Sequence, residues 1–239
     1  MKKGKTNNWV FTILMCISIL GIAVSSFYII RWKLNVDQNR SIKDHIEDSI
    51  EIEDDKLKVN FEELKKQNPD TVAYLTVDGT DIQYVVVKCS NNDYYLTHNF
   101  HEKYNVAGWI FADYKNKVDG TDQNLVIYGH NMKDGSMFGT IENIFRSDWQ
   151  NKYKDAQITL VTENGEAKYQ IFSIYRINPE DYYIQTAFSG NEYGDFLQTV
   201  KGRSEFDFGV DVTSDDQIIT LSTCLYGGAK RIALHAKKI

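Results

Sequence analysis

The sequence ITLSTCLYGGAKRIALHAKKI, residues 219–239, holds two apolar segments on either side of a glycine pair. Segments rich in Ile, Leu and Thr around a Gly-Gly turn are typical of a β-hairpin. Cys224 ends the first segment, and Arg231 begins the second. A hairpin would bring the guanidinium near the thiol, where a fixed positive charge favours the thiolate. The stretch therefore predicts a reactive cysteine at a strand end, against the alternative of a small buried thiol.

The same strand signature repeats from residue 71 onward. Helical inserts are expected at 136–145 and 191–202, the second inside a long connection of the kind that is usually functional. The turn VDGTD, residues 77–81, predicts a tight hairpin. Eight short segments rich in Val, Ile, Tyr and Thr predict a mainly β fold, an eight-stranded antiparallel-rich barrel, with strands at 71–77, 81–87, 107–113, 124–129, 157–163, 167–177, 217–224 and 230–237.

A different pattern occupies the N-terminus. The 22 residues from Trp9 to Ile30 carry no charge, which is long enough to cross a bilayer. Basic residues flank the run on both sides, so the charges alone do not fix its orientation. A cleaved signal peptide is the alternative, but the length and the bulky FYII end favour an uncleaved anchor. We expect a short tail at 1–8, a transmembrane anchor at 9–30, a helical juxtamembrane segment at 31–69 and a barrel domain at 70–239.

The juxtamembrane segment shows two helical signals. Ile42, Ile46 and Ile50 lie four residues apart among charged residues, which predicts a helix whose narrow apolar stripe lies against another surface. A solvated stalk is the alternative for this helix. Asn60 and Glu63 have the spacing of a capping box and predict a second helix, which ends before a proline.

Charge and cysteine content limit the possible functions. Residues 32–239 carry 23 basic and 33 acidic side chains, a net charge near −10 that argues against nucleic-acid binding. Cys16 lies in the apolar run, which leaves Cys89 and Cys224 in the soluble part. Two thiols in so large a domain do not make a disulfide scaffold. No strong cationic partner accompanies Cys89, so we interpret it as a structural or spare thiol.

A nucleophilic thiol needs a group that transfers protons, and two histidines compete for this role. His130 follows the strand segment NLVIYG, and Asn131 beside it has an amide suited to orient an imidazole. His235 shares a strand face with Arg231 by alternation, but it lies farther from the turn. The pattern favours His130 and leaves His235 open as its rival.

The pair His98 and His101 has a spacing that can hold a metal ion. Both lie in a polar loop without a cysteine pair or a second cluster nearby in sequence. We therefore expect no metal site and no cofactor.

Several motifs taken together resemble the sortases, cysteine transpeptidases of Gram-positive surfaces. They are TLSTC (220–224) followed by Arg231, YGHNM (128–132), GWIFADYKN (108–116) and DYYL (93–96). The resemblance covers roughly residues 60–239, in the family's order. A helix-bearing insert between the sixth and seventh strands, helices before the barrel and no evident lid or calcium-binding acidic set indicate class B. The fold implied is a sortase-like β-barrel with N-terminal helices.

The resemblance also implies the chemistry. Cys224 would attack the carbonyl after Thr in an LPXTG-like or NPQTN-like sorting signal and form a thioacyl enzyme. His130 would act as acid and then base, and Arg231 would hold the oxyanion. Looser matches assign substrate binding to five further residues, which are Ser222, Thr223, Leu96, Tyr183 and Ile184. Core packing is the alternative for Tyr183 and Ile184.

The implied partners are surface proteins with sorting signals, a peptidoglycan-precursor amine of the lipid II type, and the membrane. The resemblance also implies the orientation of a single-pass membrane protein, with the tail at 1–8 in the cytoplasm and the catalytic domain at 70–239 outside the cell. Two other functions stay open on the residues alone. One is a cysteine peptidase that only hydrolyses, and the other is an anchored surface module without activity.

Overall fold

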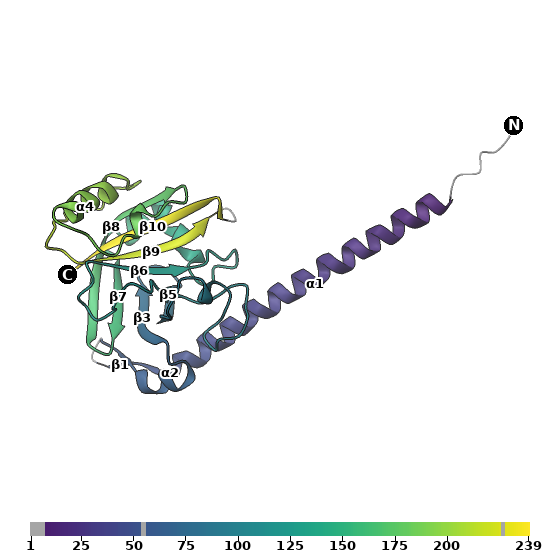
Figure 1. Ribbon diagram of the computed structural model, residues 1–239, viewed down its shortest axis with the longest axis horizontal. Helices are drawn as coiled ribbons and strands as arrows, with labels where there is room; N and C mark the ends of the chain where they lie inside the picture. The colour runs from purple at the N-terminus through teal and green to yellow at the C-terminus, as the bar shows by residue number, and fades with distance from the viewer. Residues whose placement is uncertain (1–7, 54–55, 226–227) are drawn as a thin grey trace.

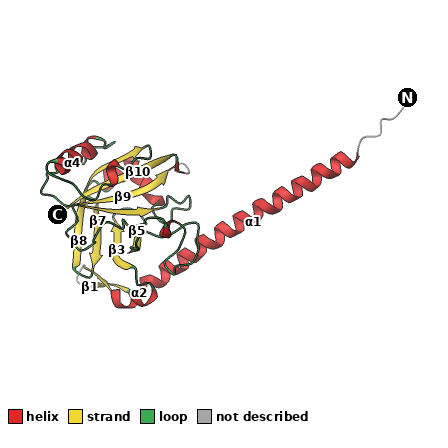
Figure 2. Cartoon of the chain, viewed as in Figure 1, coloured by secondary structure: helices red, strands yellow, loops and turns green. Residues whose placement is uncertain are grey.

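A barrel with one long projecting helix forms the computed structural model of the chain, which describes residues 8–53, 56–225 and 228–239. The C-terminal end of helix α1, Asn8–Glu47, lies at the barrel, and the rest of the helix extends away from the barrel (Figure 1). Strands make up most of the body, and the shorter helices lie at its periphery (Figure 2). The mainly β class predicted from the sequence is confirmed.

Eight strands close the barrel in the order β10-β8-β7-β3-β4-β5-β6-β9. Most neighbours are antiparallel, whereas β4 pairs with β5 and β6 with β9 in parallel. Each predicted strand segment overlaps one of these strands, although β5 is only two residues long. The strands are β3 Thr71–Val77, β4 Gln83–Val87, β5 Phe111–Ala112, β6 Asn124–Gly129, β7 Gln157–Thr162, β8 Gly165–Ile177, β9 Ile218–Leu225 and β10 Lys230–Lys238.

Alternation along the strands gives the barrel two apolar faces. Ile219, Leu221 and Leu234 are fully buried in the main core cluster. Their neighbours along the strands, Ile218 and Ala233, belong to a second cluster. Since successive side chains of a strand point to opposite faces, β9 and β10 are buried on both sides.

The second cluster is covered by the long connection between β8 and β9. This connection contains the short 3-10 helix η3, Tyr182–Ile184, and the helix α4, Glu192–Gly202, at the predicted insert position. Phe196, Leu197 and Val200 of α4 are buried against the strands. The connection is therefore a packed layer of the domain and one wall of any cleft beside β9.

The other predicted insert contains the 3-10 helix η2, Gly139–Phe145, and the short helix α3, Ser147–Lys152, follows it. One further 3-10 turn, η1, spans Tyr94–Leu96 between β4 and β5. The turn at Gly79, where φ is +70°, joins β3 to β4 as the sequence VDGTD predicted.

The segment 31–69 is more varied than its expected helical character. Ile42 and Ile46 are buried at the end of α1, so this part of the helix lies against the domain and is no solvated stalk. Ile50, however, begins a hairpin of β1 (Ile50–Glu53) and β2 (Lys56–Val59). The helix α2, Phe61–Gln67, then starts as predicted, because the Asn60 side chain accepts a hydrogen bond from the Glu63 amide at 3.1 Å.

The first part of α1 is apolar and exposed. It is the one candidate membrane span in the described part of the chain, by length and composition. Side chains between Trp9 and Ile30 have no protein cover, and several are more than half exposed. A helix that is apolar all round and uncovered has the composition of a membrane span.

Candidate active site

Strand register brings the predicted histidine beside the predicted nucleophile. In the parallel pair β6–β9, the last partners are Gly129 and Thr223. One residue farther along each strand stand His130 and Cys224. Parallel strands lie about 4.8 Å apart, so this register makes the two residues neighbours although 94 positions separate them in sequence.

The next strand adds the arginine on the other side. In the antiparallel pair β9–β10, Cys224 lies directly opposite Arg231. The Arg231 guanidinium donates to the carbonyls of Gly228 and Lys230 at 2.9 and 3.2 Å, which hold it at the turn. The predicted contact of the thiol itself lies outside the described residues, because only the backbone of Cys224 is described.

A groove runs along this row of residues. Its cavity measures about 520 Å³, and both His130 and Arg231 line it. All five residues predicted to bind substrate line it as well. The complete lining consists of Asn92, Leu96, Phe111, Tyr128, Gly129, His130, Pro179, Glu180, Asp181, Tyr183, Ile184, Ser222, Thr223 and Arg231. These residues come from β5, β6, β9, β10, η1 and the β8–β9 connection.

The half-buried imidazole of His130 is oriented by a backbone carbonyl. Its Nε2 lies 2.8 Å from the Leu96 oxygen. A carbonyl only accepts, so Nε2 carries a proton in this arrangement. The expectation that Asn131 orients the ring is wrong, because the Asn131 amide donates to Glu142 instead. The orienting group therefore comes from η1, 34 residues earlier in the chain.

Tyr183 and Ser222 join the insert to the strand that carries the cysteine. The Tyr183 hydroxyl and Ser222 Oγ lie 2.9 Å apart, and both residues are almost fully buried. Tyr183 therefore belongs to the second core cluster and to the groove wall at once. Thr223 is buried too, and among the described residues its Oγ1 has no hydrogen-bond partner. Almost none of this oxygen is exposed.

A polar network at the far end of the groove was not predicted. The buried Asp113 carboxylate accepts from Asn92 Nδ2 and from the Tyr128 hydroxyl, both at 2.8 Å. Burial, followed by the charge of Asp113, raises the pKa of Tyr128, so the phenol stays protonated and donates. The three residues fix the groove floor between η1 and β6. Their motifs resembled the family, but no spacing rule joins residues this far apart.

Beyond this network, a wider cavity of about 840 Å³ continues from the groove. The two cavities share Asn92, Tyr128, Asp181 and Ile184. Four carboxylates and one lysine line the extension, namely Asp113, Asp181, Glu192, Asp195 and Lys115. The end of the groove away from Arg231 is thus acidic.

The rival histidine, His235, lies in the core. It is fully buried, and its ring nitrogens contact the Tyr175 hydroxyl at 3.0 Å and Thr220 Oγ1 at 2.8 Å. It lies four positions along the strand from Arg231, about 13 Å away, and it does not line the groove. Cys89 is half-buried, and its thiol donates to the Asn91 carbonyl at 3.2 Å.

The His98 imidazole stacks on the Tyr94 ring, with centroids 4.1 Å apart, and its Nδ1 contacts the Tyr94 carbonyl at 2.8 Å. Among the described residues, no three His, Cys, Asp or Glu side chains gather in a group able to hold a metal ion.

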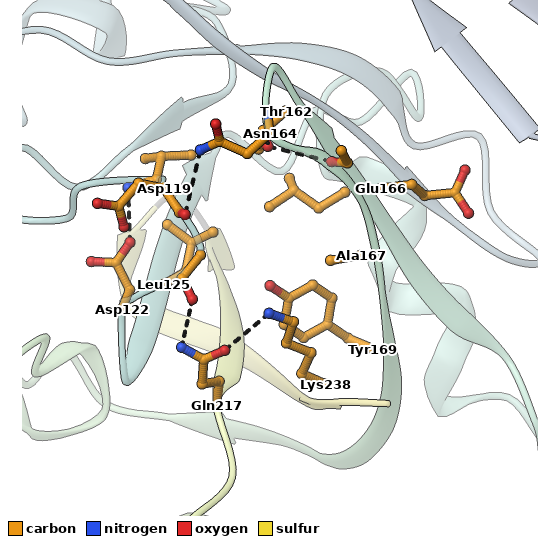
Figure 3. Close-up of a pocket in the computed structure, with 14 residues that line it drawn as sticks. Asp119, Asp122, Leu125, Thr162, Asn164, Glu166, Ala167, Tyr169, Gln217 and Lys238 are labelled. Atoms are coloured by element: carbon orange, nitrogen blue, oxygen red, sulfur yellow. Dashed lines mark hydrogen bonds between the residues drawn. The ribbon is translucent and has the colours of Figure 1, made fainter.

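A smaller cavity, about 240 Å³, lies at the opposite end of the barrel, where β6 and β9 begin (Figure 3). Its polar lining residues bond to one another. Gln217 donates to the Gly120 carbonyl at 2.7 Å and accepts from Lys238 at 3.0 Å, and Asn164 donates to the Asp119 carbonyl at 3.4 Å. These bonds close the barrel end and leave the groove as the candidate active site.

Comparison with known proteins agrees with this geometry. The sortase-domain family model matches residues 75–239. Sortase B of Listeria monocytogenes is 41% identical over 165 residues, a match that covers 68% of this chain and 65% of the Listeria protein. Sortase B of Staphylococcus aureus is 29% identical over 95% of this chain and 96% of its own length.

A solved structure extends the likeness to the fold. The crystal structure of sortase B from Bacillus anthracis has a TM-score of 0.76 at 32% identity, and the match covers 86% of this chain and 98% of that chain. The closed eight-stranded barrel, the groove beside β9 and these matches lead to one conclusion. The chain belongs to the sortase family of cysteine transpeptidases, and its relatives are class B sortases.

Proposed function

We propose that this protein is a membrane-anchored class B sortase. It cleaves an LPXTG-like or NPQTN-like sorting signal after Thr and joins the protein to a peptidoglycan-precursor amine. The observation that carries the proposal is the row of His130, Cys224 and Arg231 on three adjacent strands at the edge of one groove. The proposed roles of the three residues follow from this order.

In the first half-reaction, the Cys224 thiolate attacks the carbonyl carbon of the Thr residue and forms a C–S bond. The carbonyl oxygen becomes an oxyanion, which the Arg231 guanidinium stabilises. As the C–N bond breaks, the imidazolium of His130 donates a proton to the departing amine. The Leu96 carbonyl holds Nε2–H, which leaves Nδ1 as the nitrogen that transfers the proton. The products are a thioacyl enzyme and the released C-terminal peptide.

In the second half-reaction, the acceptor amine attacks the thioester carbon. Neutral His130 takes a proton from this amine, and the C–S bond breaks to return the thiolate. Arg231 again holds the oxyanion. The sorting signal would lie in the groove against Leu96, Tyr183 and Ile184. Ser222 and Thr223 would contact it near the reacting carbonyl.

The exposed apolar part of α1 supports anchoring in the cell membrane, with the catalytic domain outside. Tethering raises the effective concentration of the enzyme beside substrates and lipid-linked acceptors in the same membrane.

The proposal is tested with the full chain in detergent micelles, a sorting-signal peptide and an amine acceptor, with products identified by mass spectrometry. We expect an amide-linked product. Cys224→Ala should abolish it, and His130→Ala and Arg231→Ala should each lower kcat/KM by about 10²–10⁴-fold. Cys89→Ser, His101→Ala and Arg146→Ala serve as matched controls with wild-type rates.

Three results would contradict the proposal or part of it. Hydrolysed peptide alone at saturating amine would identify a peptidase. A Cys224 thiol inert to iodoacetamide, with no product, would identify a module without activity. Retained activity in any one of the three variants would remove that residue from the mechanism.

A further inference from the structure

The helix α1 passes from the apolar span into the catalytic domain without a break (Figure 1). Its apolar run ends at Ile30, and its first buried residue is Val36. At 1.5 Å per residue these two positions are about 9 Å apart along the helix axis. The barrel therefore begins to cover α1 almost directly above the end of the apolar run.

The loop around Asn105 is hydrogen-bonded to this part of the helix. Asn105 donates from Nδ2 to the Asn35 carbonyl and to Asn39 Oδ1, both at 2.9 Å. Asn39 donates in turn to the Gly108 carbonyl at 3.1 Å. Asn39 and Asn105 are almost fully buried, at 3% and 0% exposure. Buried amide pairs of this kind fix the loop and the helix relative to each other.

Tyr104, in the same loop, lies beside the C-terminal end of the apolar run. The Tyr104 ring lies with its centroid 5.7 Å from Cζ of Arg31, the first charged residue after the run. The apolar run is about 33 Å long, close to the hydrocarbon thickness of about 30 Å. The headgroup layer adds about 5 to 7 Å on each side. In a bilayer spanned by this run, Tyr104 would lie at headgroup height.

The side chains at this height have the composition of a lipid interface. Tyr104 and Val106 are 55% and 41% exposed, and on the helix Trp32 and Leu34 are 40% and 63% exposed. Aromatic residues of this kind concentrate where membrane meets water. Basic side chains accompany them, namely Arg31, Lys33 and Lys103, with Glu102 as the acidic one. This membrane-proximal patch is basic, whereas the domain as a whole is strongly acidic.

We propose that the loop 101–106 lies in the headgroup layer of the bilayer, with Tyr104 and Val106 inserted and Lys103 among anionic lipid phosphates. The barrel then keeps one orientation relative to the membrane and does not reorient about α1. Because Leu96 lies just before this loop and lines the groove, the contact also fixes the height of the groove. This inference rests on the membrane anchoring proposed above.

The test uses spin labels on the full chain, reconstituted into vesicles of phosphatidylcholine and phosphatidylglycerol. In a background of Cys16→Ala, Cys89→Ser and Cys224→Ala, one cysteine is introduced at a time. Val106→Cys and Lys103→Cys probe the loop. Ile239→Cys, at a 64% exposed position far from α1, is the matched control, and Leu20→Cys probes the span. Near-ultraviolet circular dichroism checks that each variant is folded.

Collisions with oxygen and with a water-soluble nickel chelate report the depth of each label. We expect nickel accessibility at 106 to be several-fold lower than at 239, and accessibility at 103 to lie between the two. The inference would be overturned if the nickel chelate reached the labels at 103 and 106 as readily as the label at 239 while the label at 20 lay in hydrocarbon. That result would leave the proposed anchoring intact. An aqueous label at 20 would overturn both.

Discussion

At the scale of single residues, the hydrogen bond between Tyr183 and Ser222 connects the β8–β9 connection, one wall of the groove, to strand β9. Tyr183→Phe leaves Ser222 Oγ without this partner, and Ser222→Ala leaves the tyrosine hydroxyl without it. Each change should cost about 1 kcal/mol of unfolding free energy and raise KM for the sorting peptide. The double variant should lose less unfolding free energy than the two single variants together, because both substitutions break the same hydrogen bond. Strict additivity in guanidinium unfolding would show that the two hydroxyls do not interact.

A second residue-scale prediction concerns His235. Burial, with the charge of Arg203 second, lowers its pKa to about 3. Thr220 Oγ1 donates to Asn124, so it accepts from Nδ1–H, and Nε2 accepts from Tyr175. The neutral ring is therefore the native form. Because the folded pKa lies below the unfolded value near 6.5, this stabilisation is complete above pH 6.5. It is lost as the pH falls toward 3.

Between pH 7 and pH 4.5, His235 alone should account for a loss of about 2–3 kcal/mol of unfolding free energy. His235→Gln removes the titration, so its stability should change less over the same interval, even though it is less stable at pH 7. Guanidinium unfolding of both proteins at the two pH values measures the difference. Equal slopes would mean that His235 is not held neutral by the fold.

Sequence reasoning at this scale identified side chains better than backbone partners. Cys224, Arg231 and His130 were predicted because each ends or begins a strand segment, and register then joined them. The acceptor for His130 was missed, because a carbonyl such as that of Leu96 has no sequence signature. Asn131 was misassigned for the related reason that adjacency in sequence does not fix where a side chain points after a strand ends.

At the scale of elements, Gly108 connects α1 to the active-site groove. Its φ is +58°, and a Cβ there would come within 2.4 Å of the Tyr95 carbonyl oxygen and 2.8 Å of that of Leu96. Gly108→Ala should therefore displace η1 and move the Leu96 carbonyl away from His130 Nε2. A misplacement near 1 Å can lower kcat by about 10²-fold. Steady-state kinetics with the sorting peptide measure this loss.

Gly120→Ala is the matched control. Gly120 also has a left-handed φ, +87°, but its Cβ would meet nothing within 4 Å, and it lies at the opposite end of the barrel. Both variants should lose about 1–3 kcal/mol of stability from backbone strain. Only Gly108→Ala should lose kcat, and equal kinetics in the two would separate η1 from catalysis.

The elements predicted from the sequence were those with a clear hydrophobic periodicity or a helix-capping residue. The barrel strands, α2 and α4 were predicted, whereas the β1–β2 hairpin was not. Ile50 continues the four-residue spacing of Ile42 and Ile46, so the pattern extends a helix that ends at Glu47. The predicted segment 107–113 has seven residues, but strand β5 has only two. Within that segment, only Phe111 and Ala112 form ladder pairs with neighbouring strands.

At the scale of the whole molecule, the C-terminal part of α1 is buried against the barrel. Val36, Asn39, Ile42 and Ile46 of α1 pack against the domain, whereas the residues before Arg31 do not. The apolar run could be read from the sequence, but its rigid joint to the loop around Asn105 could not, because these contacts span about 70 positions.

Removing residues 1–31 tests what anchoring contributes to function. The truncated chain keeps all four buried positions of α1, so kcat/KM for a soluble sorting peptide should stay within about twofold of the full chain. With substrate and acceptor both tethered to vesicles, the joining rate should fall by about 10²–10⁴-fold, because the effective concentration is lost. An equal loss on the soluble peptide would show that the span supports the groove itself. An unchanged rate on vesicles would show that tethering contributes nothing to turnover.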